Sequence, residues 1–309
     1  MGGANISSTS KDVGLGFNNP ALLNASMHTQ LNASFNFLYA GIHGYHLSMG
    51  YHHAKMKTDF AWGMTYYDYG TIAQTDASGN QFGNFRPVDW VMQLSASHSY
   101  LDKWHYGMTV KFINSDYGLY RSNGIAFDAG LLYHDTAHLF SASVVARNMG
   151  FQLKKYDGAE ADDLPFDLSA GFTKKLAGAP FSFSLTAVKL HQYNIRYNDT
   201  VFNNENGIIA SKGLGKVADH LVLSSSIYLG DRIECIVGYN FLRRRELNTG
   251  NSGNGLNGFS AGLAADLGKF TVTYARSYYQ SNRAMNQFGL NLTLNKLTGL
   301  GRFGQRIGW

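Results

Sequence analysis

The sequence contains few cysteines, prolines and charged residues. Its 309 residues include one cysteine, four prolines and 15% charged side chains. The single cysteine, Cys235, excludes an internal disulfide. The low charge content is unusual for a water-soluble domain, in which roughly a quarter of the residues are charged. The sequence also lacks any run of about 18 or more apolar residues, which excludes a transmembrane helix.

Basic residues are in slight excess, but they are dispersed along the chain. The net charge of +5 is too small and too scattered to indicate a nucleic-acid-binding protein. The one tight basic cluster is Arg243, Arg244 and Arg245. Two interpretations are open for this cluster: the solvated end of a strand, or a contact with lipid phosphates or an acidic partner.

Glycine, tyrosine and phenylalanine are abundant, with 35, 19 and 20 residues. Hydrophobic residues alternate with small or polar ones, most clearly from Gly258 to Tyr279, where two alternating arms flank Gly268 and Lys269. This pattern predicts a β-hairpin. Each arm has about ten residues, the length of a tilted strand that crosses a bilayer. A single hairpin of this kind also fits a soluble β-sandwich, so the number of copies decides between the two.

The alternation continues from residue 29 to residue 296 and predicts about fourteen strands. The predicted strands are Gln30–Ala40, His43–Ala54, Thr58–Ala73, Arg86–Leu101, Trp104–Arg121, Gly124–His134, Leu139–Gln152, Pro165–Leu176, Phe181–Arg196, Ala218–Leu229, Arg232–Arg245, Gly258–Leu267, Phe270–Tyr279 and Ala284–Lys296. We therefore expect an all-β fold: a transmembrane, antiparallel, up-and-down β-barrel over residues 29–296. An even number of strands returns both ends of the barrel to one side of the membrane.

The lengths of the connections support an outer-membrane barrel. Short turns, such as Asp102–Lys103 and Gly230–Asp231, alternate with connections that are mostly long. The long connections are residues 74–86, 153–164, 197–217 and 246–257. Outer-membrane barrels have tight periplasmic turns and long outer loops, whereas a soluble sandwich has no reason to sort its loops in this way.

The two ends of the chain lack the alternation. Residues 1–28 begin with Gly2 and Gly3, and Asn19 precedes Pro20 at the predicted start of a short helix, with Asn19 as its N-cap. We expect a small plug-like element at the mouth or in the lumen of the barrel, and a C-terminal tail over residues 297–309. A signal peptide, which export requires, is not recognisable. Met1 is therefore interpreted as a cloning start or as the first residue of a truncated or mature chain.

The predicted inward face carries charges of both signs, including Asp59, Lys111, Asp128 and Arg147. Such charges can pair across a narrow lumen, and their burial without a partner is costly. This favours a closed or plugged barrel over a wide porin. Cys235 lies in register with the apolar outward face and is interpreted as a small hydrophobic residue.

No catalytic, cofactor or metal site is predicted, and we expect the protein not to be an enzyme. Gly258–Gly262 matches G-x-S-x-G, but that motif needs a strand-to-helix turn, and here the alternation continues through Ser260. His46 and His52 share the inward face roughly 20 Å apart, at about 3.3 Å per residue, which is too far for a joint metal site. Residues 212–216, KGLGK, lack the full phosphate-loop pattern and are expected in an outer loop.

Several dispersed stretches resemble one family. They are GGANIS at the N-terminus, the helix start NNPALL, and the segments LPFDLSAGFTKKLAGAPFSFSLTA, VGYNFLRRREL and NGFSAGLAADLGKFTVTYARSYY. These stretches are similar to the FadL-like outer-membrane proteins of the Bacteroidetes type IX secretion system, the PorV/PorQ group, and most of all to its PorQ-type members. The resemblance covers nearly the whole chain.

The resemblance implies a non-enzymatic barrel in the cell outer membrane that anchors the attachment complex of type IX secretion. The implied partners are PorZ-, PorU- and PorV-like proteins and outer-membrane lipid or lipopolysaccharide, with no nucleic acid and no cofactor. The long outer loops would supply the contact surface. An alternative, implied by the same fold, is a FadL-like channel for uptake of hydrophobic small molecules. It predicts an apolar route past residues 1–28 and a gap in the barrel wall.

Overall fold

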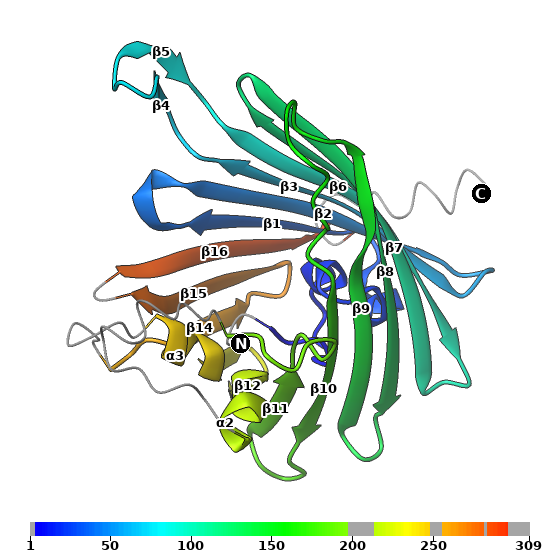
Figure 1. The fold of residues 1–309 in the computed structure, drawn as a ribbon. Coiled ribbons are helices and arrows are strands. Elements are labelled where there is room, and N and C mark those ends of the chain that lie inside the picture. The colour runs from blue at the N-terminus through cyan, green and yellow to red at the C-terminus, as the bar shows by residue number, and fades with distance from the viewer. Residues whose placement is uncertain (1–3, 197–212, 248–254, 281–282, 296–309) are drawn as a thin grey trace.

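The computed structural model describes residues 4–196, 213–247, 255–280 and 283–295. Fourteen antiparallel strands close into one barrel (Figure 1). The strands are β1 (Gln30–Phe37), β2 (His43–His53), β3 (Thr58–Asp68), β6 (Val88–Tyr100), β7 (Trp104–Tyr117), β8 (Tyr120–Asp135), β9 (Phe140–Lys154), β10 (Asp167–Lys175), β11 (Phe181–Ala187), β12 (Leu221–Leu229), β13 (Ile233–Asn240), β14 (Phe259–Asp266), β15 (Phe270–Gln280) and β16 (Arg283–Thr293). The predicted fold class and strand number are confirmed.

Each barrel strand pairs with its neighbours in sequence, and β1 pairs with β16 to close the wall. The long connection between β3 and β6 contains a further hairpin, β4 (Ile72–Thr75) with β5 (Gln81–Phe85), which forms a separate two-stranded sheet. The alternation predicted Ile72 and Ala73 as the end of the preceding strand and residues 74–86 as a loop, so this hairpin was not predicted. The gap in the wall that the channel hypothesis predicts is not seen among these fourteen strands, because each has a hydrogen-bonded neighbour on both sides.

The two-residue period sorts side chains between lipid and lumen. On β6, Leu94 is 64% exposed on the outer surface, whereas the next residue, Ser95, is 3% exposed. Ser95 pairs in register with Thr109 of β7, and their hydroxyl oxygens lie 2.7 Å apart. Cys235 lies between Ile227 and Leu263 on the lipid-facing side, as predicted. None of the helices in the described ranges is long and apolar enough to cross a membrane.

Three strands end at least about five residues earlier in the structure than the alternation indicated. β3 ends at Asp68 and β11 at Ala187, and β13 ends at Asn240 instead of continuing to Arg245. At Asn240 the side-chain oxygen accepts a hydrogen bond from the Arg243 N–H, at 3.0 Å, and starts the helix α3 (Phe241–Glu246). A cap of this kind is local chemistry that competes with the strand, because it satisfies a free backbone donor at the start of a helix.

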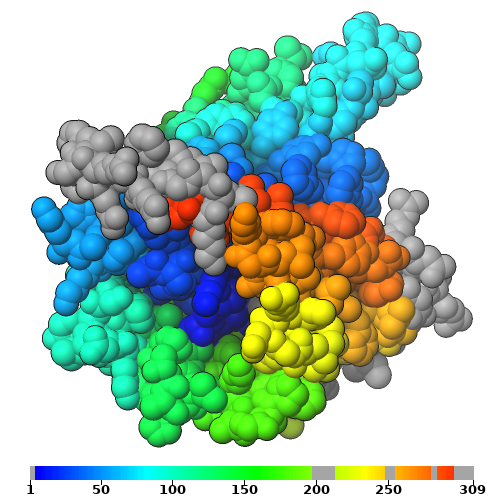
Figure 2. Space-filling view, turned by 180° about the vertical axis from the view of Figure 1, so that it is seen from behind, coloured from blue at the N-terminus to red at the C-terminus, as the bar shows by residue number. Residues whose placement is uncertain are grey.

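The wall has unequal height. β8 has 16 residues and β11 has 7, so the barrel is tall around β8 and low around β11. Near the low side lie two short helices, α2 (Leu214–Asp219) and α3, which contact each other (Figure 1). The β4–β5 hairpin stands out beyond the barrel (Figures 1 and 2).

Candidate functional site in the lumen

The N-terminal segment, residues 4–28, lies inside the barrel. It forms three short 3-10 helices, η1 (Val13–Phe17), η2 (Pro20–Leu22) and η3 (Ala25–Met27). The view in Figure 2 shows the start of the chain, in dark blue, at the centre of the ring of strands. The buried apolar residues of the structure cluster here: Val13, Leu23 and Met27 pack with Ala61 of β3, and Ala21 and Leu22 pack with Leu132 of β8.

Each short helix begins with the same side-chain cap. The carboxylate of Asp12 and the amide oxygens of Asn19 and Asn24 each accept a hydrogen bond from the backbone N–H two residues later. The prediction that Asn19 caps a helix that begins at Pro20 is confirmed. The caps at Asp12 and Asn19 satisfy backbone donors where the segment is wholly or partly buried, whereas the cap at Asn24 lies at an exposed position.

Asn19 also joins the segment to the barrel wall. Its side chain is fully buried, and its amide nitrogen donates to the Ile6 carbonyl at 2.9 Å and to the Ser143 hydroxyl of β9 at 2.6 Å. Its amide oxygen accepts from the Ala21 N–H at 3.0 Å. One buried side chain therefore connects two parts of the segment with the wall, and a buried amide without these partners would be costly.

Further hydrogen bonds hold the segment to β1 and β9. The Val13 N–H donates to the Gln30 amide oxygen at 2.7 Å, and the Ser141 hydroxyl donates to the Ser7 carbonyl at 2.7 Å. The Asp12 carboxylate accepts from the Asn32 amide at 3.2 Å. Burial raises the pKa of Asp12 above its usual value, against the effect of these hydrogen bonds.

Glycines on the inner wall provide the space for this segment. A Cβ atom on Gly107 of β7 would lie 2.5 Å from the carbonyl carbon of Pro20, and one on Gly130 of β8 would lie 2.0 Å from the Asn19 amide oxygen. A Cβ on Gly50 of β2 would lie 2.5 Å from the Met27 carbonyl oxygen. All three positions face the lumen, and a larger residue at any of them would collide with the segment, at Gly50 and Gly107 with its backbone.

A buried ion pair lies beside the segment. The Lys111 ammonium is 2.6 Å from the Asp128 carboxylate, and the two side chains are 6% and 0% exposed. The β9 backbone bulges opposite Asp128, and Asn148, with φ of 57°, donates its N–H to that carboxylate at 2.8 Å. Lys111 also donates to the Asn148 amide oxygen at 3.0 Å and lies 5.4 Å from the centre of the Phe17 ring. The bulge thus brings a third polar group to the pair.

A second inward pair extends this network along β9 and β10. The Arg147 guanidinium pairs with the Asp167 carboxylate, which also accepts from the Ser169 hydroxyl at 2.9 Å and from the Lys189 N–H at 2.8 Å. Inward charges of opposite sign do pair, but in these two cases between adjacent strands of the wall (β7 with β8, β9 with β10) and not across the lumen as predicted.

The outer half of the lumen contains a cluster of tyrosines. The Asp89 carboxylate of β6 accepts hydrogen bonds from the Tyr69 hydroxyl at 2.6 Å and the Tyr117 hydroxyl at 2.9 Å. The rings of Tyr117 and Tyr156 are stacked, with centres 6.0 Å apart. Burial, together with the Asp89 charge, raises the pKa of Tyr69, so its hydroxyl remains a donor. This site was not predicted, because its members come from separate strands and loops.

No known protein-family profile matches the sequence, and no curated protein matches it significantly. Solved structures match the fold. A TodX monoaromatic hydrocarbon channel with the deltaS2S3 mutation gives a TM-score of 0.54 at 10% identity, over 93% of this chain and 94% of that chain. The TodX deltaS2 mutant gives 0.52 at 11% identity, over 94% and 95%. A Pseudomonas aeruginosa FadL homologue gives 0.48 at 10% identity, over 91% and 93%.

The fold is that of a FadL-like outer-membrane barrel. At these identities the likeness concerns the fold alone. A closed FadL-like barrel with an apolar outer surface points to the outer membrane of a Gram-negative bacterium. These similar structures are transport barrels and not enzymes. None of them bears on the predicted role in type IX secretion.

The FadL-like fold places the arginine cluster on α3 and not on a strand. Arg243 lies 3.9 Å from the centre of the Tyr279 ring, and burial lowers its pKa. Arg245 pairs with Asp219 of α2 at 2.7 Å and donates to the Gly215 carbonyl at 2.6 Å. Arg243 and Arg245 therefore contact other parts of the protein. The predicted contact with lipid phosphates or an acidic partner stays a prediction for the cluster.

The remaining predicted sites have the following positions in the FadL-like barrel. Ser260 lies within β14, buried on the inner face, as the uninterrupted alternation indicated. His46 lies 2.9 Å from the Thr65 hydroxyl, and His52 lies 2.6 Å from the Asp59 carboxylate. Within the described ranges there is no group of three or more His, Cys, Asp or Glu residues able to hold a metal. Gly2, Gly3 and the tail 297–309 lie outside the described residues.

Proposed function

We propose that the protein is a passage for small hydrophobic molecules across the outer membrane and that the N-terminal segment closes it at rest. The observation that carries this proposal is the N-terminal segment in the lumen, packed against inward glycines of a FadL-like barrel. The similar TodX structures are described as monoaromatic hydrocarbon channels. A barrel that served only as an anchor would not need a lumen shaped around a separate segment.

The lumen has features that suit an aromatic or other apolar solute at its outer end. The rings of Tyr69, Tyr117 and Tyr156 offer flat surfaces, and aromatic pairs gain about 0.5–1.5 kcal/mol beyond the burial of their area. The hydroxyl groups of Tyr69 and Tyr117 both donate to the Asp89 carboxylate. The solute would therefore meet ring faces above the polar middle of the wall.

In the lumen, the segment carries apolar side chains among its polar ones. Leu15 and Phe17 of η1 are only partly buried, and Leu15 packs against the cluster of Ala21, Leu22 and Leu132. A segment that shifts within the lumen would expose these apolar side chains beside the solute. Passage would then depend on movement of the segment, since the fourteen-strand wall is closed all the way round.

The test is uptake of labelled toluene by cells that lack their own FadL-like barrels and express this protein. We expect accumulation several-fold above cells with an empty vector. The inward Val91→Trp variant should reduce it strongly because the added ring narrows the outer lumen, whereas the neighbouring outward Met92→Trp variant should not. Uptake equal to the empty vector, with the wild-type protein folded in the outer membrane, would refute the passage.

A second candidate function, the anchor for a surface complex, is supported by the β4–β5 hairpin. All residues of its two strands except Phe85 are exposed, and Phe82 near its tip is 68% exposed. An ordered strand pair with an exposed aromatic residue is a suitable recognition surface, because less conformational entropy is lost when a partner binds. Its partners would be PorZ-, PorU- or PorV-like proteins.

The anchor hypothesis predicts co-purification of large soluble partners with the barrel after mild detergent extraction of the native membrane. Replacement of residues 73–84 with a short Asn-Gly turn should remove those partners, and Phe82→Ser should weaken their binding. The control is Leu119→Ser at the exposed β7–β8 turn, which should leave binding unchanged. Recovery of the barrel alone, under conditions that preserve other membrane complexes, would count against this role.

A further inference from the structure

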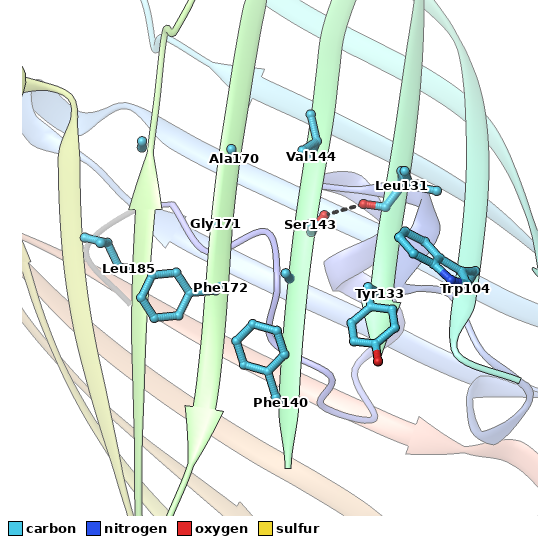
Figure 3. Close-up of a pocket in the computed structure, with 12 residues that line it drawn as sticks. Trp104, Leu131, Tyr133, Phe140, Ser143, Val144, Ala170, Gly171, Phe172 and Leu185 are labelled. Carbon is cyan, nitrogen blue, oxygen red and sulfur yellow. Dashed lines mark hydrogen bonds between the residues drawn. The ribbon is translucent and has the colours of Figure 1, made fainter. Parts of the chain in front are cut away.

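The lipid-facing wall carries an apolar groove, shown in Figure 3. Its volume is about 530 Å³, within the range of roughly 300–1,000 Å³ that is usual for small-molecule sites. It crosses strands β7 to β11 on the outside of the barrel, so it is separate from the lumen. The residues that line it include Trp104, Leu131, Phe140, Ala142, Val144 and Ala170.

The groove has a floor of small residues between aromatic and aliphatic rims. Ala142, Ala170 and Ala187 lie on neighbouring strands and form the floor. On one side the rings of Trp104 and Tyr133 are 5.0 Å apart, and on the other the rings of Phe140 and Phe172 are 6.4 Å apart (Figure 3). Because large side chains stand on both sides and only alanines lie between them, the groove is open toward the lipid along its length.

The position of the groove indicates what fills it. Trp104 follows one short turn, and Tyr133 and Phe140 flank another, so the groove begins at the edge of the barrel that the short turns identify as periplasmic. Aromatic residues at this level are typical of the girdle at the bilayer interface. The outside of the barrel at this depth is surrounded by lipid, so hydrocarbon of the periplasmic leaflet lies against the groove.

Charged groups lie at the periplasmic end of the groove. Lys174 is exposed, pairs in register with Phe140, and donates to the His138 carbonyl. Lys103 lies 2.8 Å from the Asp135 carboxylate and is about half exposed. His138 is also close to Asp135, at 3.0 Å. The two lysines thus lie at the level of the lipid headgroups, where cationic side chains bind anionic membrane surfaces, whereas the Asp135 side chain is only 6% exposed.

We propose that this groove binds one glycerophospholipid of the periplasmic leaflet. One acyl chain lies over Ala142 and Ala170 between the aromatic rims, and the phosphate contacts the ammonium groups of Lys174 and Lys103. The Asp135 carboxylate limits the net positive charge, so a single phosphate suits the site better than a highly charged headgroup. This site is independent of what passes through the lumen.

The test is titration of the purified full-length protein, in detergent, with palmitoyl-oleoyl phosphatidylglycerol, followed by native mass spectrometry. The wild type should bind one lipid molecule tightly. Ala170→Phe, which fills the groove, should weaken binding at least tenfold, and Lys174→Glu should weaken it about fivefold or more. The control is Ala261→Phe on the lipid-facing side of β14, away from the groove, which should bind as the wild type does.

Several results would overturn the proposal. Equal lipid binding by Ala170→Phe and Ala261→Phe would show that the groove is not the site. Unchanged lipid binding by Lys174→Glu would show that Lys174 does not contact the lipid phosphate. If the wild type binds no lipid and instead forms a dimer that Ala170→Phe disrupts, the groove is an interface with a second copy of the chain. Circular dichroism of each variant establishes that the barrel is folded before the titration.

Discussion

Gly107→Ala is expected to displace the N-terminal segment while the barrel remains folded. The new methyl carbon would lie 2.5 Å from the Pro20 carbonyl carbon and 2.6 Å from the Ala21 nitrogen. Both atoms belong to the backbone, so no side-chain rotation can relieve the overlap. Overpacking of this kind costs about 1–3 kcal/mol. This cost destabilises only the state in which the segment is seated in the lumen.

The change should therefore shift the equilibrium between the seated and the displaced segment by about fivefold to 140-fold, since about 1.4 kcal/mol corresponds to tenfold. Limited proteolysis of residues 4–28 in the detergent-solubilised protein measures this directly. Conductance in planar bilayers should rise in parallel, because the lumen loses the structure that fills it. Gly130→Ala should act in the same direction through its contact with Asn19.

The matched control is Gly262→Ala. Gly262 also faces the lumen, on β14, but its added Cβ would meet only the wall, with Tyr274 the nearest residue at 3.3 Å. This variant should keep the segment as protected as in the wild type. If Gly107→Ala and Gly262→Ala are cleaved at the same rate, the close contact between Gly107 and η2 does not hold the segment.

The second large effect is expected for Lys111→Met. Asp128 is completely buried, and the Lys111 ammonium at 2.6 Å is its charge partner. Removal of one member of a buried ion pair leaves an uncompensated charge and typically costs about 3–5 kcal/mol. We expect a loss of this size in the free energy of unfolding, measured by urea titration in detergent with tryptophan fluorescence as the signal.

Two further variants test whether the loss comes from the unpaired buried charge of Asp128. Lys111→Met with Asp128→Leu should recover much of the loss, because no buried charge is then left alone, although the Asn148 N–H loses its acceptor. Arg121→Met breaks the exposed Arg121–Asp116 pair, whose side chains are 66% and 30% exposed, and should cost at most about 1 kcal/mol. Equal losses for Lys111→Met and Arg121→Met would contradict the buried role of Lys111.

The sequence predicted the strands of the barrel wall better than the packing of side chains in the lumen. Fourteen strands and the inward charges followed from a two-residue period, because a strand that separates lipid from lumen imposes that period on every residue it contains. The Asn19 cap followed from the Asn-Pro pair itself, since capping is a local interaction. The type IX role followed only from resemblance, and the similar solved structures concern the fold.

The features that sequence analysis missed depend on partners distant along the chain. The bulge at Asn148 is defined by Asp128 on the neighbouring strand, and the close fit at Gly107 is defined by Pro20 in the lumen. Neither position has a local pattern that marks it. For the same reason α3 was predicted as strand, because Val237, Tyr239 and Phe241 maintain the alternation beyond the point where Asn240 starts a helix.

The sequence by itself predicted a membrane barrel, its number of strands and the side of the wall that most strand residues face. Tertiary structure alone decided where the N-terminal segment lies, which inward charges pair and where alanines leave a groove in the outer wall. The physical reason is the separation along the chain of the residues that interact. Alternation and capping act over a few residues, whereas packing in the lumen and on the wall brings together side chains more than a hundred positions apart, such as Asn19 and Ser143.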